Sequence, residues 1–328
     1  MRSATEEPLL QIEELRTHFQ TEQGTVKAVD GVDLVVGRGE VVGIVGESGC
    51  GKTVLSLSIV RLVDDAGIVS GAVRFDGHDL LALPESALNE VRGSRIAMIF
   101  QQPRLSLNPV MTVGKQIGEV LRVHDSLASR QRKQRAVELL DRVGIPDPAR
   151  VVDQHPHQLS GGMAQRVMIA IALAGKPDLL IADEPTTALD VTVQAQILGL
   201  LQDLRATEDM AIILITHDLE VVAEIADRVA VMYAGRIVEE CHVDDLYERP
   251  LHPYTIGLMQ ARPGIDTTTD RLTVIPGMVP VPIELPPGCR FAPRCDARIE
   301  RGLAVCTEVE PHPFVPEPGR VVRCWLHE

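Results

Sequence analysis

One eight-residue segment constrains this chain more than any other. Residues 46–53 have the sequence GESGCGKT, which fits the phosphate-binding loop pattern G-x-x-x-x-G-K-[ST] without a mismatch. The apolar run VVGIV precedes this loop, and Leu55, Ile59 and Leu62 follow it at helical spacing. Strand, loop and helix in this order are the context that the motif needs, so the segment predicts a phosphate site in an α/β domain.

Each position of the loop has a chemical reason. Three glycines let the backbone curl so that successive N–H groups face one anion, and the N-terminus of the next helix adds partial positive charge. Lys52 is expected to reach the β- and γ-phosphates of a nucleotide, and Thr53 to offer its hydroxyl to Mg²⁺. The expected nucleotide contacts are Gly46, Glu47, Ser48, Gly49, Cys50, Gly51, Lys52 and Thr53.

Two adjacent carboxylates follow another short apolar strand. The run LLIA at residues 179–182 leads directly into Asp183 and Glu184. Charged groups at the end of a buried parallel strand are costly unless they bind a metal ion or accept a proton. Asp183 fits a ligand of Mg²⁺, and Glu184 fits the base that orients and deprotonates an attacking water.

Polar side chains end two further apolar strands. Gln101 follows residues 96–100 and suits a ligand of a γ-phosphate, a metal ion or a water, with an ordinary loop glutamine as the alternative. His217 follows residues 211–216; its neutral imidazole suits a γ-phosphate contact, with a helix-capping histidine as the alternative. Because both strands end in a polar side chain, we favour a role in phosphate or metal binding for Gln101 and His217.

A second anion site is predicted at residues 159–165, LSGGMAQ. A Ser-Gly-Gly turn that opens a helix presents N–H groups to an anion, and Ser160 is the expected cap. Two phosphate cradles in one chain can serve one nucleotide if two such chains meet face to face.

The segments around these motifs have their own patterns. Residues 9–45 alternate like strands, with a break expected at Asp30-Gly31, and predict an antiparallel sheet. Phe19 in this sheet either stacks on an adenine ring or is a half-buried strand residue. Residues 112–170 are expected to be mostly helical, with an apolar face made by Ala136, Leu139, Leu140 and Val143. A basic stretch there forms either a partner-binding or a solvated face: Arg130, Arg132, Lys133 and Arg135.

Charge and hydropathy exclude some classes of protein. The formal net charge of the 328 residues is −14, which disfavours a nucleic-acid binder because such a protein needs a basic face. No apolar run reaches the length of about eighteen residues that a membrane span needs, and Glu6, Glu7 and Pro8 stand where a signal peptide would be apolar. We therefore expect a cytoplasmic chain that reaches a membrane only through partners.

In their order along the chain, these motifs resemble those of the ATP-binding subunits of ABC transporters, over residues 8–245. The resemblance implies a P-loop α/β cassette over residues 1–245, with an antiparallel β subdomain and a helical subdomain at about 103–170. Residues 46–53 match the Walker A loop, Gln101 the Q-loop, residues 159–165 the signature and residues 179–183 the Walker B strand. Glu184 matches the catalytic glutamate, residues 188–190 (Ala-Leu-Asp) the D-loop and His217 the switch histidine.

The resemblance also implies roles and cofactors. ATP is the expected nucleotide, and the expected catalytic residues are Lys52, Gln101, Glu184 and His217. The expected Mg²⁺ ligands are Thr53, Gln101 and Asp183. The residues expected to meet the ATP of a partner subunit are Ser160, Gly161, Gly162, Met163 and Gln165, with Asp190 in the D-loop. Met163 replaces the glutamine that is commonest in the family, which is a mild departure.

Partners follow from the same resemblance. Such subunits pair head to tail with an identical or homologous ATPase subunit, act on two transmembrane permease subunits, and lie peripherally at the cytoplasmic face of the membrane. A soluble ABC ATPase of DNA repair or translation would show basic patches, coiled-coil insertions or a second cassette, which this sequence lacks. A regulatory subunit would be expected to lack Glu184 or His217, and both are present.

The composition changes beyond about residue 245, where 13 of the 22 prolines lie, so residues 246–328 predict a loop-rich module. Its segment RPLHPYT at residues 249–255 resembles the one that follows the cassette in dipeptide and oligopeptide importers, a group that includes nickel importers. This resemblance predicts import of di- or oligopeptides from an extracytoplasmic peptide-binding protein, with a nickel or other solute importer as the alternative.

Four of the six cysteines, Cys289, Cys295, Cys306 and Cys324, lie in this module. Thiolates among proline-rich loops suit an Fe–S cluster or zinc, and unligated thiols are the third alternative. The absence of C-x-x-C pairs counts against a zinc ribbon. The four cysteines resemble those that bind a [4Fe-4S] cluster in several subunits of peptide importers, whereas Cys50 and Cys241 are expected to be structural.

Overall fold

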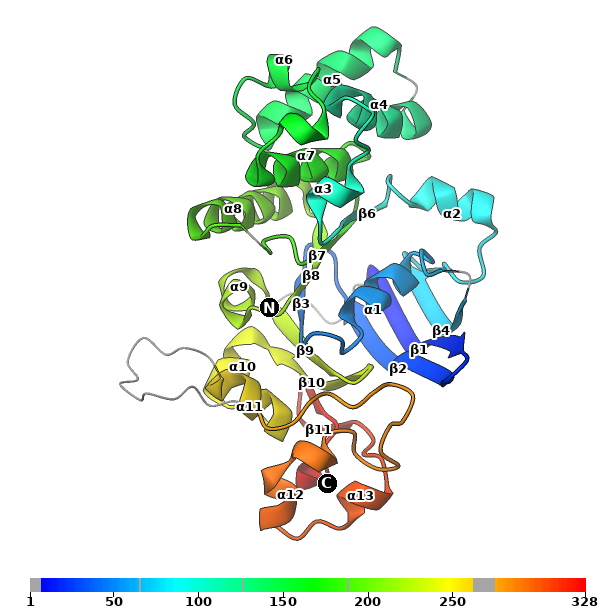
Figure 1. Ribbon diagram of the computed structural model, residues 1–328, viewed down its shortest axis with the longest axis vertical. Helices are drawn as coiled ribbons and strands as arrows, with labels where there is room; N and C mark the ends of the chain where they lie inside the picture. Colours follow the sequence, from blue (N-terminus) through cyan, green and yellow to red (C-terminus); the bar gives the residue numbers. More distant parts are fainter. Residues whose placement is uncertain (1–6, 65, 126, 188, 262–274) are drawn as a thin grey trace. The chain divides into compact units, whose positions relative to one another are not determined.

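The computed structural model describes residues 7–64, 66–125, 127–187, 189–261 and 275–328 (Figure 1). Backbone contacts divide the chain into two compact units. The first unit contains residues up to Leu9, Val36–Glu40 and Ala82–Ile215, and the second contains Leu10–Val35, Val41–Leu81 and Thr216–Glu328. Within the described residues, no helix combines the length and the apolar character that crossing a membrane requires.

Three parallel strands form the centre of the first unit. They lie in the order β6 (Ile96–Ile99), β7 (Leu179–Asp183) and β8 (Ala211–Thr216). Every residue of β7 and β8 is buried, as expected for parallel strands that are covered on both faces. The strands predicted from their apolar runs are therefore confirmed.

Helices make up most of the rest of the first unit. In Figure 1, α4, α5 and α7 pack together in green shades, and the predicted apolar face is confirmed because Ala136, Leu139, Leu140 and Val143 are at most 1% exposed. Helix α5 ends shortly before Gly144, which takes a φ of +72°, a conformation that favours glycine after a helix. The helices are α2 (Glu85–Val91), α3 (Pro103–Ser106), α4 (Val113–His124), α5 (Ser129–Arg142), α6 (Pro148–Val151), η1 (Pro156–Gln158), α7 (Gly161–Leu173) and α8 (Val191–Glu208).

The second unit contains the predicted antiparallel sheet. Its strands lie in the order β2 (Gly24–Val36), β1 (Leu10–Thr21), β4 (Gly67–Phe75) and β5 (His78–Asp79). The break expected at Asp30-Gly31 is wrong, because β2 runs through both residues. The Asp30 carboxylate is paired with the guanidinium of Arg290 and lies 2.9 Å from His18 Nε2, so a buried charge is tolerated inside the strand.

A second set of strands in this unit leads to the phosphate-binding loop. The order is β11 (Phe314–Glu317), β12 (Arg320–Val322), β10 (Arg236–His242), β9 (Arg228–Tyr233) and β3 (Val41–Val45). Strands β9 and β10 form a hairpin in which Tyr233 pairs with Arg236. Helices α1 (Lys52–Ile59), α9 (Leu219–Ile225), α10 (Val243–Glu248) and α11 (Pro253–Gln260) belong to the same unit.

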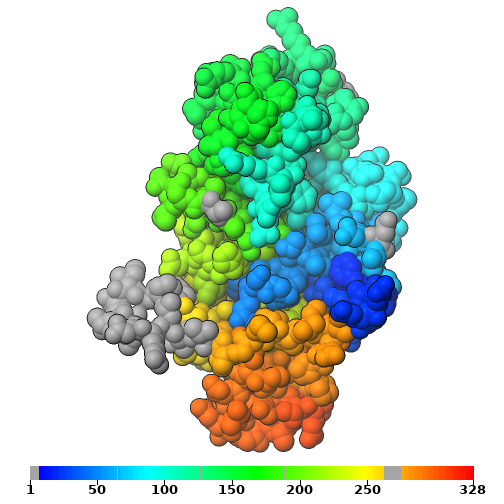
Figure 2. Space-filling view, in the orientation of Figure 1, coloured from blue at the N-terminus to red at the C-terminus, as the bar shows by residue number. Residues whose placement is uncertain are grey.

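The C-terminal module, defined here as the described residues 246–261 and 275–328, is built from short elements. Beyond α11 these are η2 (Ala292–Arg294), α12 (Asp296–Glu300), α13 (Val305–Glu308) and η3 (Trp325–His327), together with β11 and β12. Figure 2 shows residues 275–328 as one continuous orange-to-red surface. Because β12 pairs with β10, the module is joined to the sheet of the second unit.

Candidate nucleotide-binding site

The phosphate-binding loop, residues 46–53, connects β3 with α1 in the second unit. Gly51 precedes α1 with a φ of +108°, and a Cβ on it would stand 2.2 Å from the Ala28 carbonyl oxygen. A Cβ on Gly46 would stand equally close to the carbonyl oxygen of Met232. The glycines therefore let the loop pack directly on the main chain of β2 and β9, which fixes its path.

Lys52 folds back over the loop. Its ammonium donates hydrogen bonds to the carbonyl oxygens of Gly46 at 2.7 Å and Glu47 at 3.0 Å, and the residue is only 6% exposed. Cys50 is 1% exposed, and burial raises the pKa of its thiol, as expected for a structural cysteine. Ser48 and Thr53 are exposed.

We expect Lys52→Ala to weaken ATP binding by about 10- to 100-fold, because hydrogen bonds to charged groups contribute about 1.5–3 kcal/mol. Calorimetric titration with a non-hydrolysable ATP analogue measures this change. Lys133→Ala is the control, since Lys133 binds Asp153 on the surface of the first unit. An unchanged affinity in Lys52→Ala would contradict the role of the loop.

The first unit brings Gln101 and Glu184 together. Gln101 Nε2 donates a hydrogen bond of 2.8 Å to Glu184 Oε2, and the Thr187 hydroxyl donates to the same oxygen at 2.8 Å. Glu184 has a φ of +47°, and its N–H donates to the Ile215 carbonyl oxygen, which holds this turn to β8. Asp183, at the end of β7, is 1% exposed. The carboxylate of Glu184 is therefore held in one orientation by two donors.

The Ser-Gly-Gly turn opens α7. The Ser160 hydroxyl accepts a hydrogen bond of 3.2 Å from the Met163 N–H, which confirms the predicted cap. Ser160 and Gly161 are exposed, and a Cβ on Gly162 would stand 2.9 Å from a methyl of Val193. Gln165 is 1% exposed within the first unit.

The remaining predicted residues lie at separate places. Asp190 caps α8 by accepting a hydrogen bond from the Val193 N–H, whereas Ala188 of the same motif lies outside the described residues. His217 is exposed and does not cap α9, because the Asp218 carboxylate does so. Phe19 is half-buried near the end of β1, and its ring lies against the main chain of Gly67.

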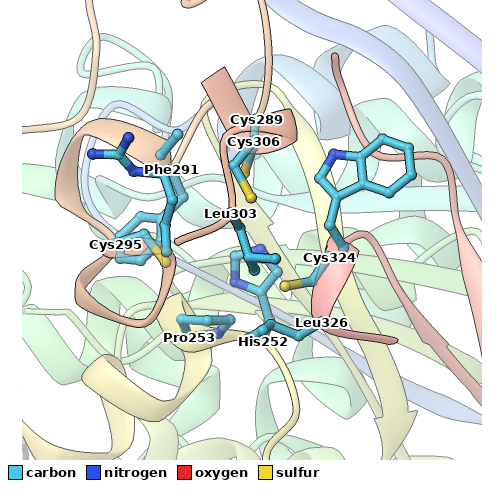
Figure 3. A pocket seen from close by; sticks show the side chains of 12 residues that line it. His252, Pro253, Cys289, Phe291, Cys295, Leu303, Cys306, Cys324 and Leu326 are labelled. Carbon is cyan, nitrogen blue, oxygen red and sulfur yellow. The ribbon is translucent and has the colours of Figure 1, made fainter. Parts of the chain in front are cut away.

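The four cysteines of the C-terminal module line one cavity, together with His252 and Phe291 (Figure 3). The space that this cavity leaves open is small, about 10 Å³. None of the described cysteines forms a disulfide. Burial raises the pKa of each of the four thiols, to about 11 for Cys289 and about 12 for Cys324.

Among the described residues, no group of three or more His, Cys, Asp or Glu side chains is arranged to hold a metal ion. His252 and Arg294, which precedes Cys295, were not predicted to be functional from the sequence. His252 is buried beside the cavity, and burial lowers its pKa to about 3.

These features define a class of protein. A glycine-rich loop with Lys52, the carboxylates after β7 and the Ser-Gly-Gly turn that opens α7 are the parts of an ATP-binding cassette. The chain belongs to the ABC transporter family, whose model matches residues 29–187. Residues 238–301 match the family model described as oligopeptide/dipeptide transporter, C-terminal region. The chain is thus an ABC ATPase with the predicted P-loop α/β fold.

Relatives match almost the whole chain. The Bacillus subtilis oligopeptide transport ATP-binding protein AppD is 50% identical over 98% of this chain and 97% of its own. A Brucella abortus protein named as a candidate peptide import ATP-binding protein is 52% identical over 97% of this chain and 94% of its own.

Solved structures match the cassette. The dimeric ATP-binding cassette MJ0796 bound to ADP and phosphate is 28% identical, with a TM-score of 0.65 over 71% of this chain and 98% of its own. The cbiO1 protein of Clostridium perfringens, part of the ABC transporter complex cbiONQ, is 30% identical to this chain. The match has a TM-score of 0.62 and covers 75% of this chain and 93% of cbiO1.

Proposed function

We propose that this chain is the ATP-hydrolysing subunit that powers the import of di- or oligopeptides through an ABC transporter. One observation carries the proposal: the chain contains both an ABC cassette and a C-terminal region of the oligopeptide/dipeptide transporter type. The family model for that region matches residues 238–301. The names of relatives about 50% identical over nearly the whole chain support the same substrate class.

The residues of the loop and the strand ends have distinct proposed roles. Residues 46–53 bind the phosphates of ATP, and Phe19 stacks on the adenine. The oxygen donors Thr53, Gln101 and Asp183 fit Mg²⁺, a hard cation that takes oxygen ligands and that would neutralise phosphate charge. His217 stabilises the charge that develops on the γ-phosphate.

Glu184 is proposed as the catalytic base. Its carboxylate already accepts hydrogen bonds from Gln101 and Thr187 on one oxygen, Oε2. In the proposed step the carboxylate takes a proton from the water as the water attacks.

Pairing completes the catalytic site. A second ATPase subunit, identical or homologous, places its signature residues against the ATP held by this chain's loop. The exposed Ser160 and Gly161 at the start of α7 support this role, since their N–H groups and hydroxyl open toward solvent. Asp190, at the start of α8, belongs to the same proposed contact with the partner.

Two permease subunits are the proposed membrane partners, and an extracytoplasmic binding protein delivers the peptide to them. The chain would then lie at the cytoplasmic face of the membrane without crossing it. In the first unit Leu105 and Val110 are each 81% exposed, and the same unit has a groove lined by residues of α4 and α5. Apolar side chains in water favour a contact surface, so this part of the first unit suits the permeases.

A [4Fe-4S] cluster is the proposed ligand of the four-cysteine cavity. Thiols are the usual ligands of such clusters, and each binds a different iron, so they stand farther apart than the ligands of one zinc ion. The four cysteines that line one cavity supply the four thiols that such a cluster needs. Main-chain N–H groups of Phe291 and Ala292 near Cys289 would stabilise a thiolate there.

We expect protein purified without oxygen to contain iron and acid-labile sulfide in equal amounts and to lose both in Cys306→Ala. Elemental analysis and visible absorption measure the two contents. Cys241→Ala is the matched control, because Cys241 is buried in β10 away from the cavity. Zinc in place of iron, or no metal in oxygen-free protein, would contradict the cluster.

Uptake by cells tests the proposed substrate. We expect cells that lack this chain to lose uptake of a labelled tripeptide and to keep uptake of labelled nickel. Loss of nickel uptake alone would retain the ATPase but overturn the substrate. Unchanged uptake of both would contradict the inference drawn from the C-terminal module.

A further inference from the structure

The C-terminal module holds the phosphate-binding loop through Glu47. Arg294 Nη1 donates to Glu47 Oε2 at 2.6 Å, and Nη2 donates to Oε1 at 3.0 Å. This is the forked geometry in which a guanidinium fixes both oxygens of a carboxylate. The Arg294 side chain is 5% exposed and the Glu47 side chain 28% exposed, so the pair is partly shielded from water.

The main chain of Glu47 is held as well. Its N–H donates a hydrogen bond of 2.8 Å to the hydroxyl of Tyr254, a fully buried residue of α11. Its carbonyl oxygen accepts the hydrogen bond from Lys52. Glu47 therefore connects Arg294 and Tyr254 of the C-terminal module to the Lys52 ammonium. That ammonium is the group proposed to bind the phosphates.

Arg294 is itself fixed by its surroundings. Its guanidinium lies 5.8 Å from the ring centre of Tyr233 and 5.9 Å from that of Phe291, and its Nε donates to the Pro276 carbonyl oxygen. A charge held on aromatic faces and by several acceptors is preorganised for its partner.

A partly buried ion pair such as this one contributes little to stability, because desolvation offsets much of its attraction. The same pair is an effective device for orientation, and a phosphate cradle works only when its N–H groups are correctly aimed.

We propose that Arg294 and Tyr254 are positioning residues that set the phosphate-binding loop for ATP, so that ATP affinity depends on the C-terminal module. The proposal rests on the ATP-binding role of the cassette and not on the transported solute. Phe291 extends the contact, because it lines the four-cysteine cavity and packs against Tyr233 and Tyr254. A change in the cavity would therefore reach the loop.

A double-mutant cycle on the full chain tests the proposal, with a non-hydrolysable ATP analogue as the probe. Glu47→Gln and Arg294→Met are each expected to weaken binding by about tenfold, the scale of a lost charge-assisted hydrogen bond. The double variant is expected to bind no more weakly than either single variant. Arg294→Lys should recover part of the affinity, since it restores the charge without the fork.

Tyr254→Phe keeps the ring and removes only the hydroxyl, so it reports on the main-chain contact without disturbing the packing. We expect it to raise the KM for ATP by roughly three- to tenfold while kcat at saturating ATP stays within twofold. The matched control is Arg320→Met, because Arg320 forms a buried pair with Glu239 in the same unit and contacts no residue of the loop.

Three results would overturn the proposal. The first is unchanged ATP affinity in folded Arg294→Met or Tyr254→Phe. The second is additive losses in the double variant. The third is an equal loss of affinity in Arg320→Met, which would mean that general destabilisation of the module, measured as a lower Tm, explains the effect.

Discussion

Glu184→Gln is expected to lower the rate of ATP hydrolysis by ~10² or more, which is the scale of a lost catalytic contact. We expect ATP binding to stay nearly intact. The amide has the size of the carboxylate and can still accept hydrogen bonds from Gln101 and Thr187, so the turn after β7 keeps its geometry. It cannot take a proton from water at neutral pH. Phosphate release at saturating ATP, measured beside nucleotide binding, separates the two effects.

Glu208→Gln is the control for this variant, because Glu208 pairs with Arg142 at the end of α8 and its substitution removes the same charge. We expect the control to hydrolyse ATP at the normal rate. ATP hydrolysis at the native rate by Glu184→Gln would show that another group takes the proton, and it would contradict the assignment of Glu184 as the base.

Gly51→Ala is expected to abolish most ATP binding. The added Cβ would lie 2.2 Å from the Ala28 carbonyl oxygen, and the φ of +108° is strained for any residue with a side chain. Overpacking and left-handed strain together cost about 2–5 kcal/mol, which corresponds to a loss of affinity of about 30-fold or more. Because the added Cβ would meet a main-chain oxygen, no rotamer change relieves the contact.

Gly199→Ala is the matched control, since a Cβ on Gly199 meets no atom within 4 Å. Gly199 lies inside α8, where alanine favours a helix by about 1 kcal/mol over glycine, so this variant should be at least as stable as the native chain. Normal nucleotide affinity in folded Gly51→Ala would mean that the loop does not bind the phosphates.

The sequence was most informative where local pattern determines structure. The apolar runs before Gly46, Asp183 and His217 predicted buried strands, and the polar residues that end them are where a parallel sheet exposes its functional edge. Ser160 was predictable as a cap because its hydroxyl needs only the N–H three residues later.

Other features depend on contacts between distant residues. The Asp30-Gly31 pair predicts a turn by composition, but Arg290, 260 positions later, pairs with the Asp30 carboxylate and keeps β2 continuous. The pairing of Glu47 with Arg294 spans 247 positions and leaves no local pattern. No periodicity or spacing in one sequence reveals such a pair, so only the fold could identify it.

The initial rate of labelled tripeptide uptake, in cells where Glu184→Gln replaces the native chain at equal abundance, tests the central claim most directly. If ATP hydrolysis by this chain powers peptide import, uptake should fall to the level of cells without the chain while the variant still binds ATP. Tripeptide uptake at the native rate in that strain would contradict the account.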